Sequence, residues 1–176
     1  RVLDLFSYLG AWGLQAAIAG ASDVVLVESS AKAQTMALEN ATNNGVAGRV
    51  RQIVGDVFVV LKTLREEQQR FDIVIADPPA FIKRRRDFAA GLEAYHRLNR
   101  MAMQVLAKDG LLVSASCSFH LPWDELRALL LRSARHLDRN LQILEQGHQA
   151  ADHPVHPAIP ETDYVKCLFG RVLPAA

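Results

Sequence analysis

The sequence has little cysteine and no long hydrophobic run. Its two cysteines, Cys117 and Cys167, form no Cys-x-x-Cys pair, which argues against a disulfide framework and against a thiolate zinc site. No apolar stretch approaches the roughly 20 residues of a membrane-spanning helix, and no signal-peptide pattern is visible. We therefore expect a cytoplasmic protein in a reducing compartment, with no membrane partner.

The sequence also lacks an excess of charge of either sign. Its 20 Lys and Arg residues and 19 Asp and Glu residues give a formal net charge of +1, so only local patches could indicate a nucleic-acid binder. Hydrophobic residues make up 50% of the 176 positions, which suffices for the core of one domain. A strand pattern begins at the second residue without a preceding methionine, so we expect residues 1–176 to be a fragment of a longer chain.

Strand and helix patterns alternate along the first two thirds of the chain. Short β-branched or leucine-rich runs predict strands at 2–6, 23–28, 50–54, 71–76 and 110–116. Helical patterns lie between them at 11–19, 30–44, 56–68 and 87–107, and the last of these has one apolar stripe from Phe88 to Val105. Alternating strands and helices predict a mostly parallel sheet with helices on both faces.

The last third of the chain changes pattern. A helix at 122–138 is expected to have Pro122 in its first turn. Two strands follow at 141–147 and 164–172, joined by a segment at 149–160 that has three prolines and no helical period. We expect these two strands to pair antiparallel. A Rossmann-like α/β sheet of seven strands with the last one reversed is the layout of class I S-adenosylmethionine methyltransferases.

A glycine-containing turn follows the first predicted strand. Glycine at 10 and 13 lets the backbone approach a ligand closely, and the N-terminus of the next helix can bind an anionic group. The turn does not match the G-x-G-x-x-G dinucleotide fingerprint. A purely structural turn remains an alternative interpretation.

Acidic residues end the next three predicted strands. Glu28 lies where doubly wound nucleotide-binding folds place an acid on ribose hydroxyls. Asp56 is suited to accept a hydrogen bond from an adenine amine, although Asp is also a favoured helix N-cap, and Glu28 could be a solvated acid. Asp77 ends the fourth strand. The predicted cofactor-binding residues are Phe6, Ser7, Tyr8, Gly10, Glu28, Asp56, Val57 and Asp77.

The sequence Asp77-Pro78-Pro79-Ala80-Phe81 resembles motif IV of nucleic-acid methyltransferases, in which D/N-P-P-[YFW] holds an exocyclic amino group. Ala80 stands where that motif has an aromatic residue, and Phe81 follows one place later. This departure argues against methylation of an amino group and leaves methylation of a ring carbon open.

Cys117 follows the fifth predicted strand, at the same sheet edge as Asp77. Carbon 5 of a pyrimidine is a poor nucleophile until a thiolate adds to carbon 6, and cysteine is suited to this addition. We therefore predict Cys117 and Asp77 as catalytic residues. A small core hydrophobe is the alternative for Cys117, and it is the expected role of Cys167 within the apolar final strand.

The chain as a whole resembles the RlmI-type large-subunit ribosomal RNA cytosine-5 methyltransferases. The resemblance is carried by Phe-Ser-Tyr-x-Gly (6–10), Asp-Val-Phe (56–58), Phe-Asp-x-x-x-x-Asp-Pro-Pro-x-Phe (71–81), Ser-Cys-Ser (116–118) and Gln-Ala-Ala-Asp-His-Pro (149–154). It implies S-adenosylmethionine as methyl donor, a cytosine in 23S ribosomal RNA as substrate, and Cys117 as nucleophile. It also implies an N-terminal PUA domain and a linking region outside residues 1–176. Related enzymes carry a second cysteine beside the motif IV proline, where this chain has Ala80, so the base that removes the carbon-5 proton is unassigned.

Two segments near the predicted catalytic edge suit contact with RNA. Four consecutive cations follow the Asp-Pro-Pro loop and could neutralise phosphates, although a charge run is often only a solvated loop. The spacing of the histidines at 148, 153 and 156 does not fit zinc, so we expect no metal. Trp12 and Trp123 are interpreted as packing residues. The predicted RNA contacts are Pro78, Pro79, Phe81, Lys83, Arg84, Arg85, Arg86, Asp152 and His153.

Two other classes of function remain open. One is a methyltransferase that acts on a small molecule or a protein, and the other is a non-catalytic Rossmann-like binding module with a redox thiol. The oligomeric state is also open, with a homodimer among the options.

Overall fold

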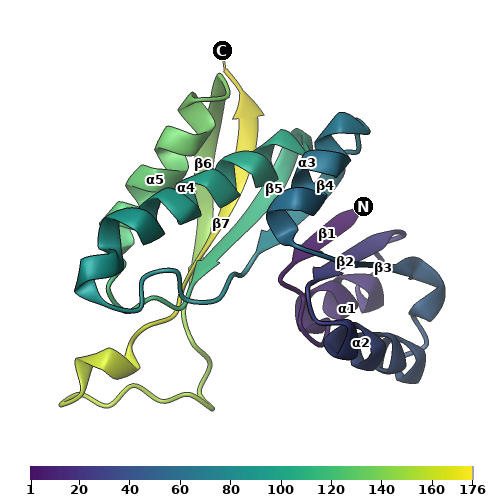
Figure 1. Cartoon of the computed structure of the whole chain (residues 1–176), viewed down its shortest axis with the longest axis horizontal. Helices are drawn as coiled ribbons and strands as arrows, with labels where there is room; N and C mark the ends of the chain where they lie inside the picture. Colours follow the sequence, from purple (N-terminus) through teal and green to yellow (C-terminus); the bar gives the residue numbers. More distant parts are fainter. Residues whose placement is uncertain (176) are drawn as a thin grey trace.

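The apolar runs between the turns form the strands of one sheet. In the computed structural model, which describes residues 1–175, seven strands lie in the order β3-β2-β1-β4-β5-β7-β6 (Figure 1). Strands β1 to β5 run parallel to one another, and β7 runs antiparallel to both β5 and β6. The strands are β1 (Val2–Leu5), β2 (Val24–Glu28), β3 (Val50–Val54), β4 (Phe71–Ala76), β5 (Leu106–Ser116), β6 (Arg139–Gly147) and β7 (Lys166–Pro174).

Helices cover both faces of this sheet (Figure 1). One face carries α1 (Ala11–Ile18) and α2 (Ala31–Asn43), and the other carries α3 (Val57–Glu66), α4 (Phe88–Gln104) and α5 (Trp123–Arg135). Short 3₁₀ turns lie at η1 (Ala47–Arg49), η2 (Arg85–Asp87) and η3 (Pro160–Thr162). None of the helices within residues 1–175 is both long and apolar enough to cross a membrane.

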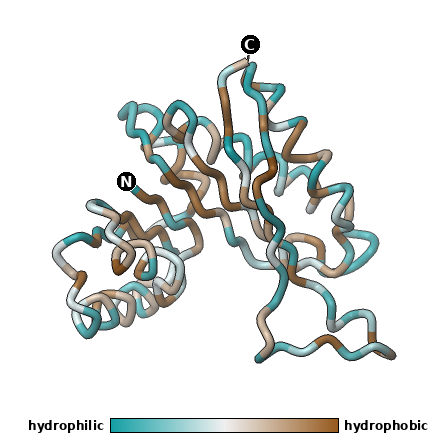
Figure 2. The backbone as a smooth tube through the Cα atoms, turned by 180° about the vertical axis from the view of Figure 1, so that it is seen from behind, coloured by the Kyte–Doolittle hydropathy of each residue, from teal (hydrophilic) through white to brown (hydrophobic). Residues whose placement is uncertain are grey.

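The two-residue period of β1 divides the core into two layers. Leu3 and Leu5 pack in a cluster with α3, α4 and α5, whereas Val2 packs on the opposite side with Leu14 of α1. Figure 2 shows hydrophobic colouring along the central strands, between the more polar helices. Each large aliphatic side chain fully buried in these layers stabilises the fold by about 1.5–3 kcal/mol. The carboxyl ends of β1 to β5 are therefore held together at one edge.

Several predicted boundaries were wrong by a few residues. The helix predicted at 87–107 ends at Gln104, and β5 begins at Leu106 rather than at residue 110. The reason is tertiary: the amide of Phe71 donates to the carbonyl of Val105 at 3.0 Å, which draws this apolar segment into the sheet. Pro122 is the N-cap of α5 and precedes its first turn. Strands β6 and β7 pair antiparallel as predicted, with bounds shifted by two residues at some ends.

Candidate active site at the carboxyl ends of the strands

The turn after β1 folds tightly over the sheet edge. Gly10 has a φ of 84°, a left-handed conformation that favours glycine, and its amide donates to the carbonyl of Ser7 at 2.7 Å. The amide of Ser7 in turn donates to the carbonyl of Val27 in β2 at 3.0 Å. The side chain of Tyr8 is left 66% exposed beside the sheet edge. The predicted turn residues at 6–10 thus form an open rim at the sheet edge, and hydrogen bonds hold the backbone of this rim in place.

Asp4, which sequence reasoning missed, supports this turn from below. Its carboxylate is fully buried, and Oδ2 accepts a hydrogen bond from the amide of Gly13 at 2.8 Å. A Cβ atom on Gly13 would lie 2.4 Å from Leu26 Cδ2, so glycine is required for this close approach. Burial raises the pKa of Asp4 to about 7, and the carboxylate of Asp77 acts in the same direction. The sequence feature that could have indicated Asp4 is an acidic residue inside an apolar strand.

The raised pKa of Asp4 predicts that stability falls as pH rises. The folded pKa of about 7 exceeds the ordinary value of 3.8, so the folded chain holds this proton more tightly than the unfolded chain. The stabilisation is complete below about pH 4 and is lost as pH rises to about 7. Urea unfolding of wild type and Asp4→Asn between pH 4 and 8 should show this loss in wild type only. Parallel pH profiles of the two proteins would contradict the prediction.

Glu28 is anchored at the end of β2 with its carboxylate at the rim. Oε2 accepts from the amide of Tyr8 at 3.2 Å, and Oε1 accepts from the amide of Ser30 at 2.9 Å and from Ser29 Oγ at 3.1 Å. These hydrogen bonds lower the pKa of Glu28 against the opposing effect of burial. A carboxylate has about four acceptor positions, so an acceptor position is left for a ligand hydroxyl.

Asp56 lies at the end of β3 and caps α3. Its Oδ1 accepts hydrogen bonds from the amides of Phe58 at 2.9 Å and Val59 at 3.1 Å. The N-cap interpretation of Asp56 is therefore confirmed, and the second carboxylate oxygen is available for other contacts. The side chain of Val57 is buried in the core, so its side chain cannot contact a ligand at the rim.

Asp77 meets an unexpected partner. The indole Nε1 of Trp12 donates to Asp77 Oδ2 at 3.0 Å, so the interpretation of Trp12 as a packing residue was incomplete. Burial raises the pKa of Asp77, and the hydrogen bond from Trp12 opposes this shift. The contact joins α1 to the loop after β4, across more than 60 residues of chain. Only the folded sheet brings these two side chains together.

Cys117 follows β5 directly and is half-buried. Its Sγ lies 3.8 Å from the carbonyl oxygen of Pro78, which places the thiol against the Asp-Pro-Pro loop. Burial raises the pKa of Cys117, and the carboxylate of Asp77 raises it further. Cys167 is buried within β7, where burial raises its pKa to about 12. The structure therefore brings Cys117 and Asp77 together, and it confirms the core position of Cys167.

A buried tyrosine holds the loops after β4 and β5 together. The Tyr95 hydroxyl, from α4, is 2.9 Å from Ser116 Oγ and 2.9 Å from Ser118 Oγ. Ser118 Oγ also accepts from the amide of Ile82 at 3.1 Å. The serines on either side of Cys117 are thus hydrogen-bonded to α4 and to the loop after β4. Sequence reasoning placed Tyr95 only in an apolar stripe.

A cavity of about 540 Å³ opens beside Cys117. Its lining includes the basic side chains of Lys83 and Arg85, whereas Arg84 and Arg86 are exposed on the same loop. Phe81 packs edge-on against Phe6 of the first turn, with ring centroids 6.3 Å apart, so the rim and this loop are in contact. The cavity is lined by Ala80, Ile82, Lys83, Arg85, Cys117, Phe119, His120, Glu161 and Tyr164.

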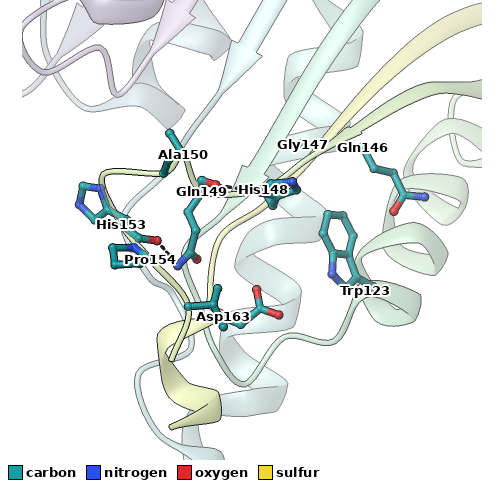
Figure 3. Close-up of a pocket in the computed structure, with 11 residues that line it drawn as sticks. Trp123, Gln146, Gly147, His148, Gln149, Ala150, His153, Pro154 and Asp163 are labelled. Carbon is teal, nitrogen blue, oxygen red and sulfur yellow. Dashed lines mark hydrogen bonds between the residues drawn. The ribbon is translucent and has the colours of Figure 1, made fainter. Parts of the chain in front are cut away.

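The connector between β6 and β7 extends beyond the same sheet edge (Figure 1). Its Asp152 and His153 are exposed, and Asp152 Oδ1 lies 3.2 Å from His153 Nδ1. His153 also lines a second cavity of about 530 Å³, into which the indole of Trp123 and the carboxylate of Asp163 point (Figure 3). Trp123 also packs against the main core cluster, so its interpretation as a packing residue is confirmed. Within residues 1–175, no group of three His, Cys, Asp or Glu side chains is placed to hold a metal ion.

Comparisons with known proteins agree with this geometry. The family model described as Conserved hypothetical protein 95 matches residues 1–115. The chain is 36% identical over 174 residues to "Ribosomal RNA large subunit methyltransferase I" of Serratia proteamaculans, and 34% identical to the protein of the same name in Escherichia coli. Each alignment covers 98% of this chain but 44% of the relative, so the chain spans less than half the length of these relatives.

Solved structures share the fold. A crystal structure of a protein complexed with SAH superposes with a TM-score of 0.84 at 23% identity, over 97% of this chain and 44% of that chain. The SAM-dependent methyltransferase from Agrobacterium tumefaciens superposes with a TM-score of 0.70 at 23% identity, over 98% of this chain and 55% of that chain. The predicted class I methyltransferase fold is confirmed, and so is the resemblance to large-subunit ribosomal RNA methyltransferases.

Proposed function

Because the chain belongs to the Conserved hypothetical protein 95 family, we propose that it is the catalytic region of an S-adenosylmethionine-dependent methyltransferase that modifies carbon 5 of a cytosine in 23S ribosomal RNA. The relatives named as ribosomal RNA methyltransferases support the substrate class. The carrying observation is that the Cys117 thiol and the Asp77 carboxyl lie at neighbouring strand ends. Because ribosomal RNA is the proposed substrate, we propose a cytoplasmic location as well.

The strand-end acids match the hydrogen-bond donors of S-adenosylmethionine. Its ribose hydroxyls, adenine amine and ammonium group are all donors, and Glu28, Asp56 and Asp77 each offer a carboxylate oxygen at the sheet edge. We assign the ribose to Glu28 and the adenine amine to Asp56, with the backbone of Phe6, Ser7, Tyr8 and Gly10 closing the rim. When bound there, the cofactor supplies an electrophilic methyl group.

The residues of the cavity activate the substrate ring. The Cys117 thiolate adds to carbon 6 of cytosine, and the electron pair of the ring double bond moves to make carbon 5 nucleophilic. After carbon 5 is alkylated, loss of its proton and cleavage of the sulfur–carbon bond restore the ring and the thiolate. Asp77 hydrogen-bonds the polar edge of the cytosine. Its carboxylate accepts such a bond from the exocyclic amine of the base, as Oδ2 accepts from the indole of Trp12.

RNA contacts are assigned to the two exposed segments at the sheet edge. The run of cations at 83–86 adjoins the cavity beside Cys117, and the connector that carries Asp152 and His153 contributes Glu161 and Tyr164 to the lining of this cavity. Pro78, Pro79 and Phe81 form the loop between Asp77 and these cations. A single-stranded or extruded base is required, since a base within a stack cannot reach the thiol.

We expect residues 1–176 by themselves to bind RNA weakly and with strong salt dependence. Each cation that no longer neutralises a phosphate of single-stranded RNA should reduce the slope of log affinity against log salt by about 0.7. Fluorescence anisotropy with a labelled 23S fragment should therefore show a shallower slope, by about 1.4, for the double change Arg84→Ala and Arg86→Ala. Arg65→Ala, an exposed position on α3, is the matched control. Tight binding that salt does not weaken would contradict the prediction.

The substrate assignment is tested by mapping 5-methylcytosine in ribosomal RNA. Mass spectrometry of 23S RNA from a strain lacking the gene should show the loss of one methylated cytosine, which the intact gene restores. Transfer of label from the methyl donor to a protein or a small molecule, but not to RNA, would support the alternative methyltransferase class. A non-catalytic module would show no affinity for the donor.

A further inference from the structure

Lys166 is a buried cation next to the segment that carries Cys117. It is the first residue of β7, and only 6% of its surface is exposed. Its backbone pairs with Ser116, the residue directly before Cys117. Lysine is almost never buried to this degree unless a partner holds it. In the sequence, Lys166 is recognisable as a single lysine at the start of an apolar strand. The proposed function assigns it no role.

The ammonium of Lys166 is held by carbonyl groups. Nζ donates to the carbonyl oxygens of Ser118 at 3.4 Å and Tyr164 at 3.2 Å. None of the ion pairs formed within residues 1–175 includes Lys166. An ammonium has three donors, so one remains beyond these two carbonyls. Burying a cation without an anionic partner is unfavourable, which favours a role with a transient anion.

The thiol of Cys117 is the group that becomes an anion here. Burial and the carboxylate of Asp77 both raise the pKa of Cys117, whereas hydrogen bonds from the backbone of Cys117 and Ala80 and the positive charge of Lys166 lower it. Burial lowers the pKa of Lys166 itself, and Asp163 opposes that shift. The other titratable groups around this site are Lys83, Arg85, Tyr95, His120, Glu161 and Tyr164. Of these, the exposed charges are screened by water and salt far more than a buried ammonium.

We propose that the ammonium of Lys166 stabilises the thiolate of Cys117 and is the positioning residue of the nucleophile. The thiol gives its proton to water, and Lys166 keeps all three of its own protons. The carbonyls of Ser118 and Tyr164 hold the ammonium next to the segment that carries Cys117 before substrate arrives. This inference rests on the proposed function, because it assigns a task to the thiolate that adds to cytosine.

The test is the pH dependence of alkylation, without RNA or cofactor. Iodoacetamide reacts with the thiolate, and mass spectrometry of the Cys117 peptide gives its rate separately from that of the buried Cys167. In Lys166→Met, the midpoint of the pH profile of Cys117 alkylation should rise by about one pH unit. The alkylation rate at pH 7 should fall about tenfold. Lys166→Arg restores the cation and should return the midpoint to within a few tenths of wild type. Asp77→Asn should move the midpoint the opposite way.

A measurement on the wild-type chain separates Lys166 from the exposed cations. Raising the salt from about 0.1 M to 1 M shortens the screening length from about 10 Å to 3 Å. The wild-type midpoint should hardly move, because the Lys166 charge is buried. A rise comparable to that expected for Lys166→Met would assign the effect to Lys83 and Arg85 and would overturn the proposal, even if the Met variant failed to fold. A folded Lys166→Met chain with an unchanged midpoint would overturn it as well.

The two proposals fail separately. A normal covalent adduct with RNA, together with a midpoint independent of Lys166, would reject the role of Lys166 alone. A midpoint that depends on Lys166 in a protein that methylates no RNA would reject the proposed function alone.

Discussion

Replacing Cys117 by serine should abolish methyl transfer, with a loss beyond about a thousandfold, because an alkoxide is far less available than a thiolate at neutral pH. The structure places this thiol in the lining of a cavity and against the Asp-Pro-Pro loop. The full-length enzyme should also form a stable adduct with RNA carrying 5-fluorocytosine, because fluorine cannot leave carbon 5 as a proton does. Gel electrophoresis under denaturing conditions would detect that adduct, and Cys117→Ser should lack it.

The second cysteine provides the matched control. Cys167 is buried in β7, and its thiol faces the core rather than the cavity beside Cys117. Cys167→Ser should keep both turnover and adduct, with some loss of stability from the buried hydroxyl. Cofactor binding by Cys117→Ser should equal that of wild type in calorimetry. Near-normal methylation by Cys117→Ser would show that the thiol only packs, and the cytosine-5 assignment would fail with it.

Replacing Glu28 by alanine should weaken binding of S-adenosylmethionine by about 1–3 kcal/mol, which corresponds to about 5- to 150-fold in affinity. Two contributions add in this variant. The ribose hydroxyls lose their acceptor, and the amides of Tyr8 and Ser30 lose the carboxylate that orders the rim. Isothermal titration calorimetry with the cofactor or its demethylated product measures the loss directly.

Two variants separate these contributions. Glu28→Gln keeps one side-chain oxygen for the backbone amides, so its loss of affinity should be smaller than that of the alanine variant. Glu39→Ala, an exposed acid on α2, controls for the change in net charge. Thermal unfolding without ligand should be measured for each protein, because a disordered rim would lower its midpoint. Unchanged affinity in Glu28→Ala would remove this residue from the site.

Most of the fold could be predicted from the sequence because its signals are local. Apolar runs bounded by turn residues marked all seven strands, and helical periodicity marked the five α-helices between them. The prediction for the segment at 105–109 was wrong because Val105 and Leu106 suit an apolar helix stripe and a buried strand equally well. The hydrogen bond from the amide of Phe71 to the carbonyl of Val105 favours the strand, because it joins this segment to the sheet.

The candidate site also has a part that the sequence predicts and a part that depends on the tertiary structure. The sequence by itself determined that Glu28, Asp56, Asp77 and Cys117 lie at one sheet edge, because parallel strands end on the same side. Only the tertiary structure decided which side chains meet there. Trp12 reaches Asp77, Tyr95 joins the two serines around Cys117, and Lys166 lies behind them. These contacts join residues far apart in the chain, and they depend on strand register and helix packing, which no local pattern encodes.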